Sequence, residues 1–296
     1  MKNNQSQQGK RYPMSLILSV AEYSSAAWYG RKSKSEKTRK PGPSPLVSDG
    51  VLLELVKYEV ANGYFHSEGY KKVDARLKSK KVVASKRRVL SLMQDHSLLT
   101  PNRPKSNGSS RKHDGTIITK IPNKMWGTDG KYFYTAQEGR CCLFSVIDHC
   151  TDEILGHCIV KKADRFAAIE AVREAVRNEF GDVKKGTCEG VGLFVRADHG
   201  SQYSSADFKK EMKFLRIEES PAFVRSPECN GIIERFHRTL EDELLSFTQF
   251  ETLEDAKILI EEFIGRYNNH WIIERHGYLS PIEYKKKLKK ISLKSA

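Results

Sequence analysis

Three acidic residues occupy positions from which their carboxylates can act together. Asp129 lies in the segment WGTDG, Asp198 ends the apolar run GLFVRAD, and Glu234 lies in NGIIERFHRTL. Carboxylate oxygens are the ligands that Mg²⁺ and Mn²⁺ prefer. Two such ions, about 3.5–4 Å apart, can activate a nucleophile and stabilise the leaving oxygen when a phosphodiester is attacked. The three acids therefore predict a site that holds two divalent ions for phosphodiester hydrolysis or transfer.

The elements that must position these acids follow from the hydrophobic patterning of residues 126–284. β-rich segments and amphipathic segments alternate in the order βββαβαβαα. The predicted strands cover 131–137, 140–150, 152–160 and 192–198, with a short one after 217, and the predicted helices cover 165–180, 205–217, 230–247 and 252–270. This order indicates an α/β fold in which helices cover a mixed sheet. Asp198 then lies at the carboxyl end of a strand, where open α/β sheets place their sites.

Two of the predicted helices carry explicit expectations about which side chains face inward. In the helix at 165–180 the inward positions are Phe166, Ile169, Val172, Val176 and Phe180. In the helix that contains Glu234 the buried stripe is Ile233, Phe236, Leu240 and Leu244. The adjacent, polar face of that helix carries Glu234, His237, Arg238 and Glu241. Glu234 can thus lean over the edge of the sheet while its apolar neighbours pack.

Three short helical patterns precede this region, within residues 51–100. The third begins after Ser85, a good N-cap residue, and its first turn is Lys86, Arg87 and Arg88. Positive charge at a helix N-terminus opposes the helix dipole, which is easier to understand if those residues meet phosphate. The pattern predicts a helix-turn-helix domain that contacts DNA. A three-helix domain with a solvated basic face gives the same pattern.

The charge of the chain is unevenly distributed. The net charge is +14 over 296 residues, yet residues 1–125 alone carry 25 Lys and Arg against nine Asp and Glu. Residues 126–284 are net acidic, and six lysines follow from Lys285 onward. A basic front and tail around an acidic middle are typical of a polyanion-binding protein with a carboxylate-rich site. A charged surface without a partner remains the alternative for the front half.

Composition excludes several other classes of protein. No stretch approaches 18 apolar residues, and the N-terminus lacks the features of a secretory signal, so we expect no membrane partner. Six cysteines without a CxxC pair favour the reducing cytoplasm of a cell over a disulfide scaffold. The predicted organisation is a basic segment and linker at 1–50, a helix-turn-helix domain at 51–100, a linker at 101–125, a catalytic core at 126–284 and a basic tail at 285–296.

The core motifs together resemble those of one large group of proteins. In order they are WGTDG, LFSVIDHCTDEILGHCIV, VRADHGSQYSSADF, SPECNGIIERFHRTLEDEL and RYNNHWIIERHGYLSPIEY. Thirty-five residues separate Asp198 from Glu234. The set resembles the Asp-Asp-Glu catalytic core shared by retroviral integrases and insertion-sequence transposases, and is most similar to the orfB type of transposase. The resemblance implies an RNase H-like fold and covers roughly residues 51–285.

The resemblance also implies roles for individual residues. Asp129, Asp198 and Glu234 match the three acids that bind two Mg²⁺ (or Mn²⁺) ions. Arg238 matches a basic position that faces the DNA end. His199 either contacts the attacked phosphate or is simply solvated, and Lys131 either touches phosphate or weakens metal binding. The segment that contains Tyr267, Asn268, Arg275 and Pro281 matches a C-terminal motif with either a structural or a DNA-contacting role.

This chain departs from the family pattern near the acids. Gly130 and Lys131 follow Asp129 where many relatives have an Ile-Thr pair, and Glu241 stands where retroviral relatives carry a lysine. Asp152 and Glu153 replace a Ser-Arg pair. Asp148, at the end of a predicted strand, is interpreted as a structural hydrogen-bonding acid and not as a fourth metal ligand.

The implied function is metal-dependent cleavage at the ends of a mobile DNA element, followed by joining of the exposed 3′-OH to another phosphodiester. The family implies DNA as partner (element ends and target), a homo-oligomer on DNA, and a first-frame (orfA) partner or fusion. Two alternatives remain open at this stage: a non-catalytic DNA-binding regulator or decayed remnant, and a general RNase H-like nuclease.

Overall fold

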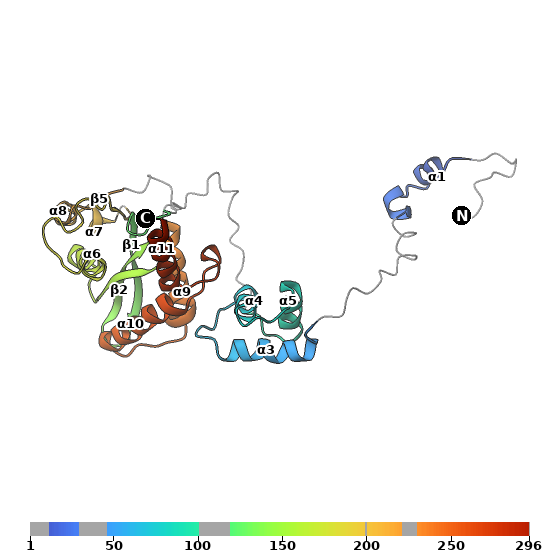
Figure 1. The fold of residues 1–296 in the computed structure, drawn as a ribbon, viewed down its shortest axis with the longest axis horizontal. Coiled ribbons are helices and arrows are strands. Elements are labelled where there is room, and N and C mark those ends of the chain that lie inside the picture. The colour runs from blue at the N-terminus through green and yellow to red at the C-terminus, as the bar shows by residue number, and fades with distance from the viewer. Residues whose placement is uncertain (1–11, 30–45, 101–118, 199, 221–229, 296) are drawn as a thin grey trace. The chain divides into compact units, whose positions relative to one another are not determined.

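A computed structural model describes residues 12–29, 46–100, 119–198, 200–220 and 230–295 (Figure 1). The chain divides into two compact units, residues 1–46 and 47–296. The first unit contains helix α1 (Met14–Val20) and a second helical stretch at 25–29. Glu22, between these two helical stretches, has a positive φ of 50°. Most of the predicted segment 1–50 and of the linker 101–125 lies outside the described residues.

The second unit contains a five-stranded sheet. Its strands are β1 (Met125–Thr135), β2 (Gly139–Asp148), β3 (Ile154–Val160), β4 (Phe194–Arg196) and β5 (Glu218–Glu219). The spatial order is β3-β2-β1-β4-β5, antiparallel among β1, β2 and β3 and parallel from β1 to β4 to β5. This confirms the predicted mixed sheet and the RNase H-like fold class. The first strand begins earlier than its patterning suggested, so Asp129 lies inside it.

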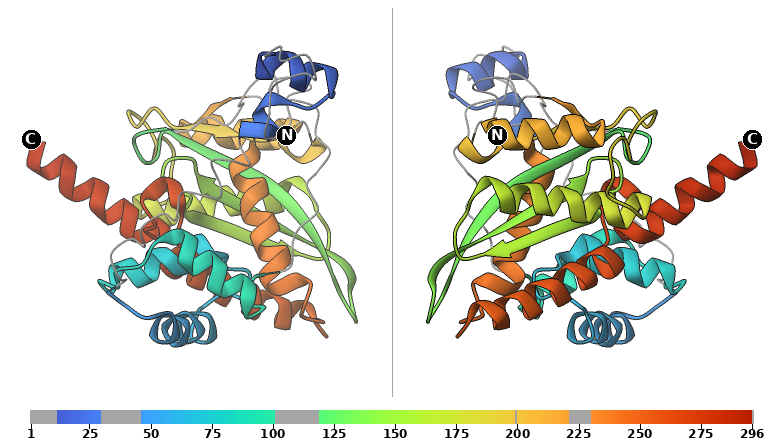
Figure 2. Two further views of the ribbon diagram at one scale, coloured as in Figure 1. Left: turned by 90° about the vertical axis from the view of Figure 1, so that its right-hand side faces the viewer. Right: turned by 90° about the vertical axis from the view of Figure 1, so that its left-hand side faces the viewer.

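Helices cover both faces of the sheet, as the two opposite views of Figure 2 show. One face is covered by α6 (Arg165–Phe180), α7 (Ser201–Ser204) and α8 (Ala206–Leu215). The other is covered by α9 (Gly231–Leu240), the π-helical turn η2 (Glu241–Leu245) and α10 (Leu253–His270). Each face buries its own hydrophobic cluster, and the predicted order βββαβαβαα is confirmed. None of the described helices is long and apolar enough to cross a bilayer.

Helix α6 lies unusually close to β3 because of a glycine. A Cβ on Gly156 would collide with the backbone of α6 at Ala171 and Ala175. The buried stripe of α6 accordingly contains small residues such as Ala168, which let the two backbones approach. The inward position expected for Phe166 is wrong: its side chain is 58% exposed and lies beneath the Arg165 guanidinium, because alanines occupy the contact.

Residues 47–100 form three helices around a small core of their own. They are α3 (Asp49–Ala61), α4 (Tyr70–Ser79) and α5 (Lys86–Asp95). The Ser85 side chain caps α5 by accepting from the Arg88 amide, as expected. The loop between α3 and α4 contacts the sheet region: Phe65 is buried against Phe263, and the Glu243 carboxylate accepts the His66 amide at 2.7 Å. The helix-turn-helix identity of this segment and the domain boundaries stay predictions.

The C-terminal segment wraps back onto the sheet through polar contacts. It contains η3 (Glu274–His276) and α11 (Pro281–Ser295), so the expected boundary between core and tail at 284–285 falls inside a helix. The Asn268 amide bonds both the amide and the carbonyl of Ile154, and Arg275 pairs with Asp152 at 2.7 Å. Of the two open interpretations of this motif, these contacts favour the structural one for Asn268 and Arg275.

Candidate active site

Asp129 and Asp198 come from adjacent parallel strands. In the register of β1 and β4, Gly127 is paired with Arg196. Asp129 lies two residues beyond Gly127, and Asp198 lies two residues beyond Arg196, just after β4 ends. Continuing the register by two positions therefore brings the two aspartates to the same level of the sheet.

The buried side chain of Tyr203 lies near both aspartates. It lines one hollow with Asp198, and its hydroxyl lies 3.3 Å from the hydroxyl of Thr128, the neighbour of Asp129. Burial raises the pKa of Tyr203 well above its ordinary value, and the negative charges of Asp129 and Asp198 raise it further.

Each aspartate is oriented by hydrogen bonds within its own loop or strand. The Gly130 amide donates to Asp129 Oδ1 at 2.8 Å, and the Gly200 amide donates to Asp198 Oδ1 at 2.9 Å. A Cβ on Gly200 would approach Asp198 Oδ1 to 2.9 Å, so the glycine makes room for this turn. Within the described ranges no Lys or Arg forms an ion pair with either aspartate. Two close carboxylates without a cation are a fitting donor set for a hard divalent ion.

Glu234 lies on a helix that covers the sheet, whereas the two aspartates belong to the sheet strands or the turn that follows one. It lies in the first turn of α9 and is exposed. In the part of the chain that the structure describes, no three His, Cys, Asp or Glu side chains gather closely enough to hold a metal ion. The structure thus brings Asp129 and Asp198 together and leaves Glu234 on the helix that covers their face of the sheet, outside such a group.

His237 differs from its expected place on the polar face of α9. Its side chain is only 8% exposed, because it lies between the helix and the sheet. His237 Nε2 lies 2.9 Å from the Ser145 hydroxyl, and Nδ1 lies 3.5 Å from Asp129 Oδ2. The lone hydroxyl in the otherwise apolar strand CCLFSVI was the available signal that this strand requires a polar partner.

The predicted DNA contacts fall into three groups. Arg87 and Arg238 are exposed and Lys86 is partly exposed. Arg88 and Lys131 have partners inside the protein: Arg88 binds the carboxylate of Asp49 and the carbonyl of Val47, and Lys131 pairs with Glu241 at 2.8 Å. His199 lies outside the described residues. Lys131 therefore faces Glu241 on η2, and the two departures from the family pattern compensate each other in charge.

A hollow beside Asp198 contains two lysines that the sequence analysis did not single out. It has a volume of about 450 Å³ and lies between the end of β4 and helices α7 and α8. Asp198, Tyr203, Lys209 and Lys213 line it. Lys209 and Lys213 are one helical turn apart on α8, so both can face the same ligand. The i, i+4 lysine pair in DFKKEMKFL was the signal in the sequence.

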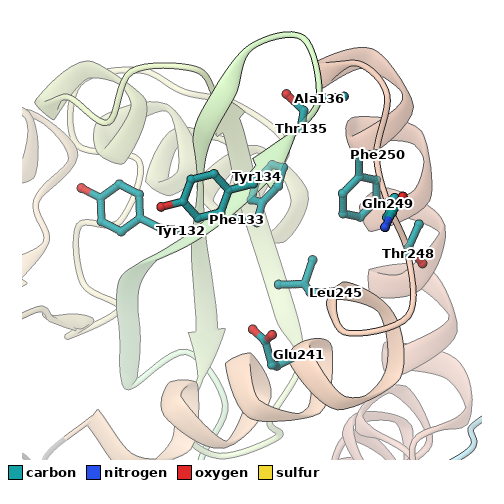
Figure 3. A pocket seen from close by; sticks show the side chains of 10 residues that line it. All are labelled: Tyr132, Phe133, Tyr134, Thr135, Ala136, Glu241, Leu245, Thr248, Gln249 and Phe250. Carbon is teal, nitrogen blue, oxygen red and sulfur yellow. The ribbon is translucent and has the colours of Figure 1, made fainter.

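A second depression lies between β1 and η2 and is largely apolar (Figure 3). It has a volume of about 520 Å³, and its lining includes Phe133, Leu245 and Phe250. Glu241 lies at its edge, but none of the three predicted acids lines it. This groove is thus distinct from the acidic site.

Asp148 has the structural role expected for it. Its carboxylate accepts the backbone amides of Asn123, Cys150 and Thr151, and the nearest of these lies at 2.5 Å. Burial raises its pKa to about 6 in spite of these three donors. Asp148 fixes the turn after β2 and the entry to β1.

Comparisons with known proteins show which proteins this chain is similar to. Two sequence profiles, both described as Integrase core domain, match residues 119–227 and 215–281. Transposase InsD for insertion element IS2A/D/F/H/I/K of Escherichia coli is 28% identical over 238 residues, which cover 78% of this chain and 77% of that protein. Transposase InsD for insertion element IS2-9 of Escherichia coli strain K12 has the same identity and covers 78% and 76%.

Solved structures give more distant similarities. The catalytic core domain of BIV integrase is 16% identical, with a TM-score of 0.41 over 59% of this chain and 99% of that chain. The HTLV-2 integrase catalytic core domain in complex with magnesium is 17% identical, with a TM-score of 0.39 over 55% and 97%. The catalytic domain of Mos1 mariner transposase is 12% identical, with a TM-score of 0.40 over 48% and 70%.

The sheet order and the profile matches define residues 119–281 as an integrase core domain. Over most of both chains, the protein is similar to the InsD insertion-sequence transposases.

Proposed function

We propose that this chain cleaves DNA at the ends of a mobile element and joins the exposed 3′-OH to target DNA, with Asp129, Asp198 and Glu234 as its catalytic acids. The observation that carries the proposal is the pair of aspartates at one level of β1 and β4, without a Lys or Arg partner among the described residues, inside an integrase core.

Asp129 and Asp198 would hold the metal ions, and Glu234 would complete the set from α9. When bound, two Mg²⁺ or Mn²⁺ ions would supply activation of the attacking oxygen and stabilisation of the leaving oxygen. The protein's own contribution is to orient the carboxylates: the Gly130 and Gly200 amides fix one oxygen of each aspartate.

Basic side chains around the site would bind the DNA backbone. Lys209 and Lys213 line the hollow that contains Asp198, and Arg238 is exposed one turn after Glu234. In the three-helix segment, Lys86 and Arg87 are the better candidates for phosphate contacts than Arg88, which Asp49 already neutralises. These contacts would make binding fall steeply with salt concentration.

Two ends of an element must be brought together for joining, so we propose that the chain acts as a homo-oligomer on DNA. A first-frame (orfA) product, as separate partner or as fusion, would supply further recognition of the ends. Neither proposal rests on a residue of the described structure.

The test is cleavage and joining of labelled oligonucleotides that carry the element's own ends. We would compare wild type with Asp198→Asn and Glu234→Gln in Mg²⁺, in Mn²⁺ and in EDTA. Metal-dependent joining by the wild type alone is the expected result. Asp207→Asn is a matched control, because Asp207 is an acid of α8 that pairs with Arg165 and does not line the hollow beside Asp198.

Two other outcomes would count against the proposal. Binding of the ends without cleavage in any metal, with or without an orfA product, would indicate a regulator. Cleavage of any duplex without joined products would indicate a general nuclease. For the hollow, Lys209→Ala with Lys213→Ala should weaken end binding and reduce its salt dependence, whereas Lys184→Ala on an exposed turn should not.

A further inference from the structure

A chain of three polar side chains, the buried Ser145 and His237 and the partly exposed Asp129, connects the sheet to α9. Asp129 on β1 is directly opposite Ser145 on β2 in the antiparallel register. His237 of α9 lies above this pair and reaches both: Nε2 is 2.9 Å from Ser145 Oγ, and Nδ1 is 3.5 Å from Asp129 Oδ2. Ser145 is fully buried, so its hydroxyl cannot exchange this partner for water.

The two nitrogens of the imidazole have different neighbours. A carboxylate can only accept a hydrogen bond, so Nδ1, which faces Asp129, is suited to donate to it. The Ser145 hydroxyl can donate or accept, so it can bond Nε2 in either role. Ser145 thereby holds the ring with Nδ1 directed at Asp129 Oδ2, the kind of support that hydrogen-bond partners give to metal-binding groups.

The same side chain also ties α9 to the sheet. Glu234 precedes His237 by three residues, about one helical turn. Most of the other contacts between α9 and the sheet are apolar packing through residues such as Ile233 and Phe236, which does not fix the rotation of a helix as sharply as a directional bond. His237 therefore links the strand that holds the first acid to the helix that holds the third.

We propose that His237, held by Ser145, is a positioning residue that orients the Asp129 carboxylate and fixes α9, and with it Glu234, over the two aspartates. This inference rests on the proposed function, because it assumes that Asp129 binds metal. Without His237 the Asp129 carboxylate can rotate about its side-chain bonds, and one oxygen loses its fixed direction. Loss of a residue that hydrogen-bonds to a metal ligand typically lowers metal affinity or activity about 10-fold to 100-fold.

The experiment uses the full chain with four substitutions. His237→Leu removes both polar contacts and keeps an apolar side chain in the cavity. His237→Gln retains one donor and one acceptor, Ser145→Ala removes only the hydroxyl, and Asp129→Asn is the reference for loss of the acid itself. Mn²⁺ affinity is measured without DNA by the electron paramagnetic resonance signal of free Mn²⁺. Thermal unfolding, end binding and strand cleavage are measured in parallel.

We expect His237→Leu to weaken Mn²⁺ binding and to slow cleavage about 10-fold or more, with end binding unchanged. Ser145→Ala should have a smaller effect in the same direction, and His237→Gln should recover most of the loss. The inference is overturned if His237→Leu binds Mn²⁺ like the wild type. It is also overturned if Leu and Gln variants lose activity equally and in step with their unfolding temperatures, since that is the signature of packing alone.

Failure of the proposed function gives a different result. If Asp129→Asn binds Mn²⁺ and cleaves DNA like the wild type, Asp129 is not a metal ligand, and both proposals fall together. If Asp129→Asn loses Mn²⁺ while His237→Leu does not, only the positioning role of His237 is wrong.

Discussion

At the scale of single residues, two departures from the family pattern turn out to be one feature. Lys131 on β1 adds a positive charge to the family pattern, and Glu241 on η2 replaces a positive charge by a negative one. In the structure, Lys131 Nζ lies 2.8 Å from the Glu241 carboxylate. Lys131 lies two residues after Asp129 on the same strand, hence on the same face of the sheet. Its pairing with Glu241 compensates the charge of the ammonium and so preserves the acidic character of the site.

This pairing predicts the result of a charge swap. Lys131→Glu or Glu241→Lys alone should lower the free energy of unfolding by about 0.2–1 kcal/mol, because the pair is partly exposed and becomes a like-charge contact. The double variant should recover most of that loss, as read from urea unfolding midpoints. Additive losses in the double variant would show that the two side chains do not interact in solution.

Asp148 predicts a pH dependence of stability. Burial raises its pKa from the ordinary 3.8 to about 6 in the folded protein. The folded state therefore holds the proton more tightly, and this contribution is fully present below about pH 4 and is lost as pH rises through 6. A pKa shift of this size corresponds to roughly 3 kcal/mol in the free energy of unfolding.

Asp148→Asn cannot titrate, so the difference in unfolding free energy between wild type and variant should change across pH 4 to 7. Other buried acids such as Glu153, whose pKa burial also raises, are present in both proteins and cancel in the difference. Parallel stability curves for the two proteins would contradict the raised pKa of Asp148.

At the scale of elements, close packing of α6 on β3 depends on one position without a side chain. Gly156→Ala would place a methyl group against backbone atoms of Ala171 and Ala175, which cannot move as a side-chain end can. We expect a loss of about 1–3 kcal/mol or more, measured by chemical denaturation. Gly265→Ala is the matched control, since Gly265 is exposed within α10 with no atom near its would-be Cβ.

The control should be neutral or stabilise by about 0.4–1 kcal/mol, because alanine restricts the unfolded chain. Equal effects at the two glycines would mean that α6 can shift away from β3 at little cost, and that its alanine stripe does not reflect a fixed contact.

At the scale of the whole molecule, the basic C-terminal segment is not a simple electrostatic tail. Lys285 is only 14% exposed and lies between the carboxylates of Glu153 and Glu179, which raise its pKa against the opposing effect of its burial. It ties α11 to the residue just before β3 and to α6. The lysines that follow, such as Lys287, are exposed and remain candidates for phosphate contact.

Two lysine substitutions separate these roles. Lys285→Met should lower the free energy of unfolding by about 3–5 kcal/mol, because two poorly exposed carboxylates lose their cation. Lys287→Met should change stability by less than about 0.5 kcal/mol. If Lys287 contacts a phosphate, this variant should also reduce the slope of log binding constant against log salt concentration by about 0.9. Equal stability of the two variants would show that Lys285 is not held as the structure describes.

The sequence by itself determined the order of the elements and the sheet class, because hydrophobic periodicity is a local property of the chain. It also proposed the three acids, through the family motifs. Helix α6 begins and ends where its patterning predicts, and Asp198 lies just after its strand. The direction of single side chains was not local. Phe166 faces solvent because alanines fit the narrow contact with Gly156, and His237 is buried because Ser145 and Asp129 lie across the sheet from it. Only the tertiary structure decided which charges meet, since Lys131 with Glu241 and Lys285 with Glu153 join residues more than 100 positions apart.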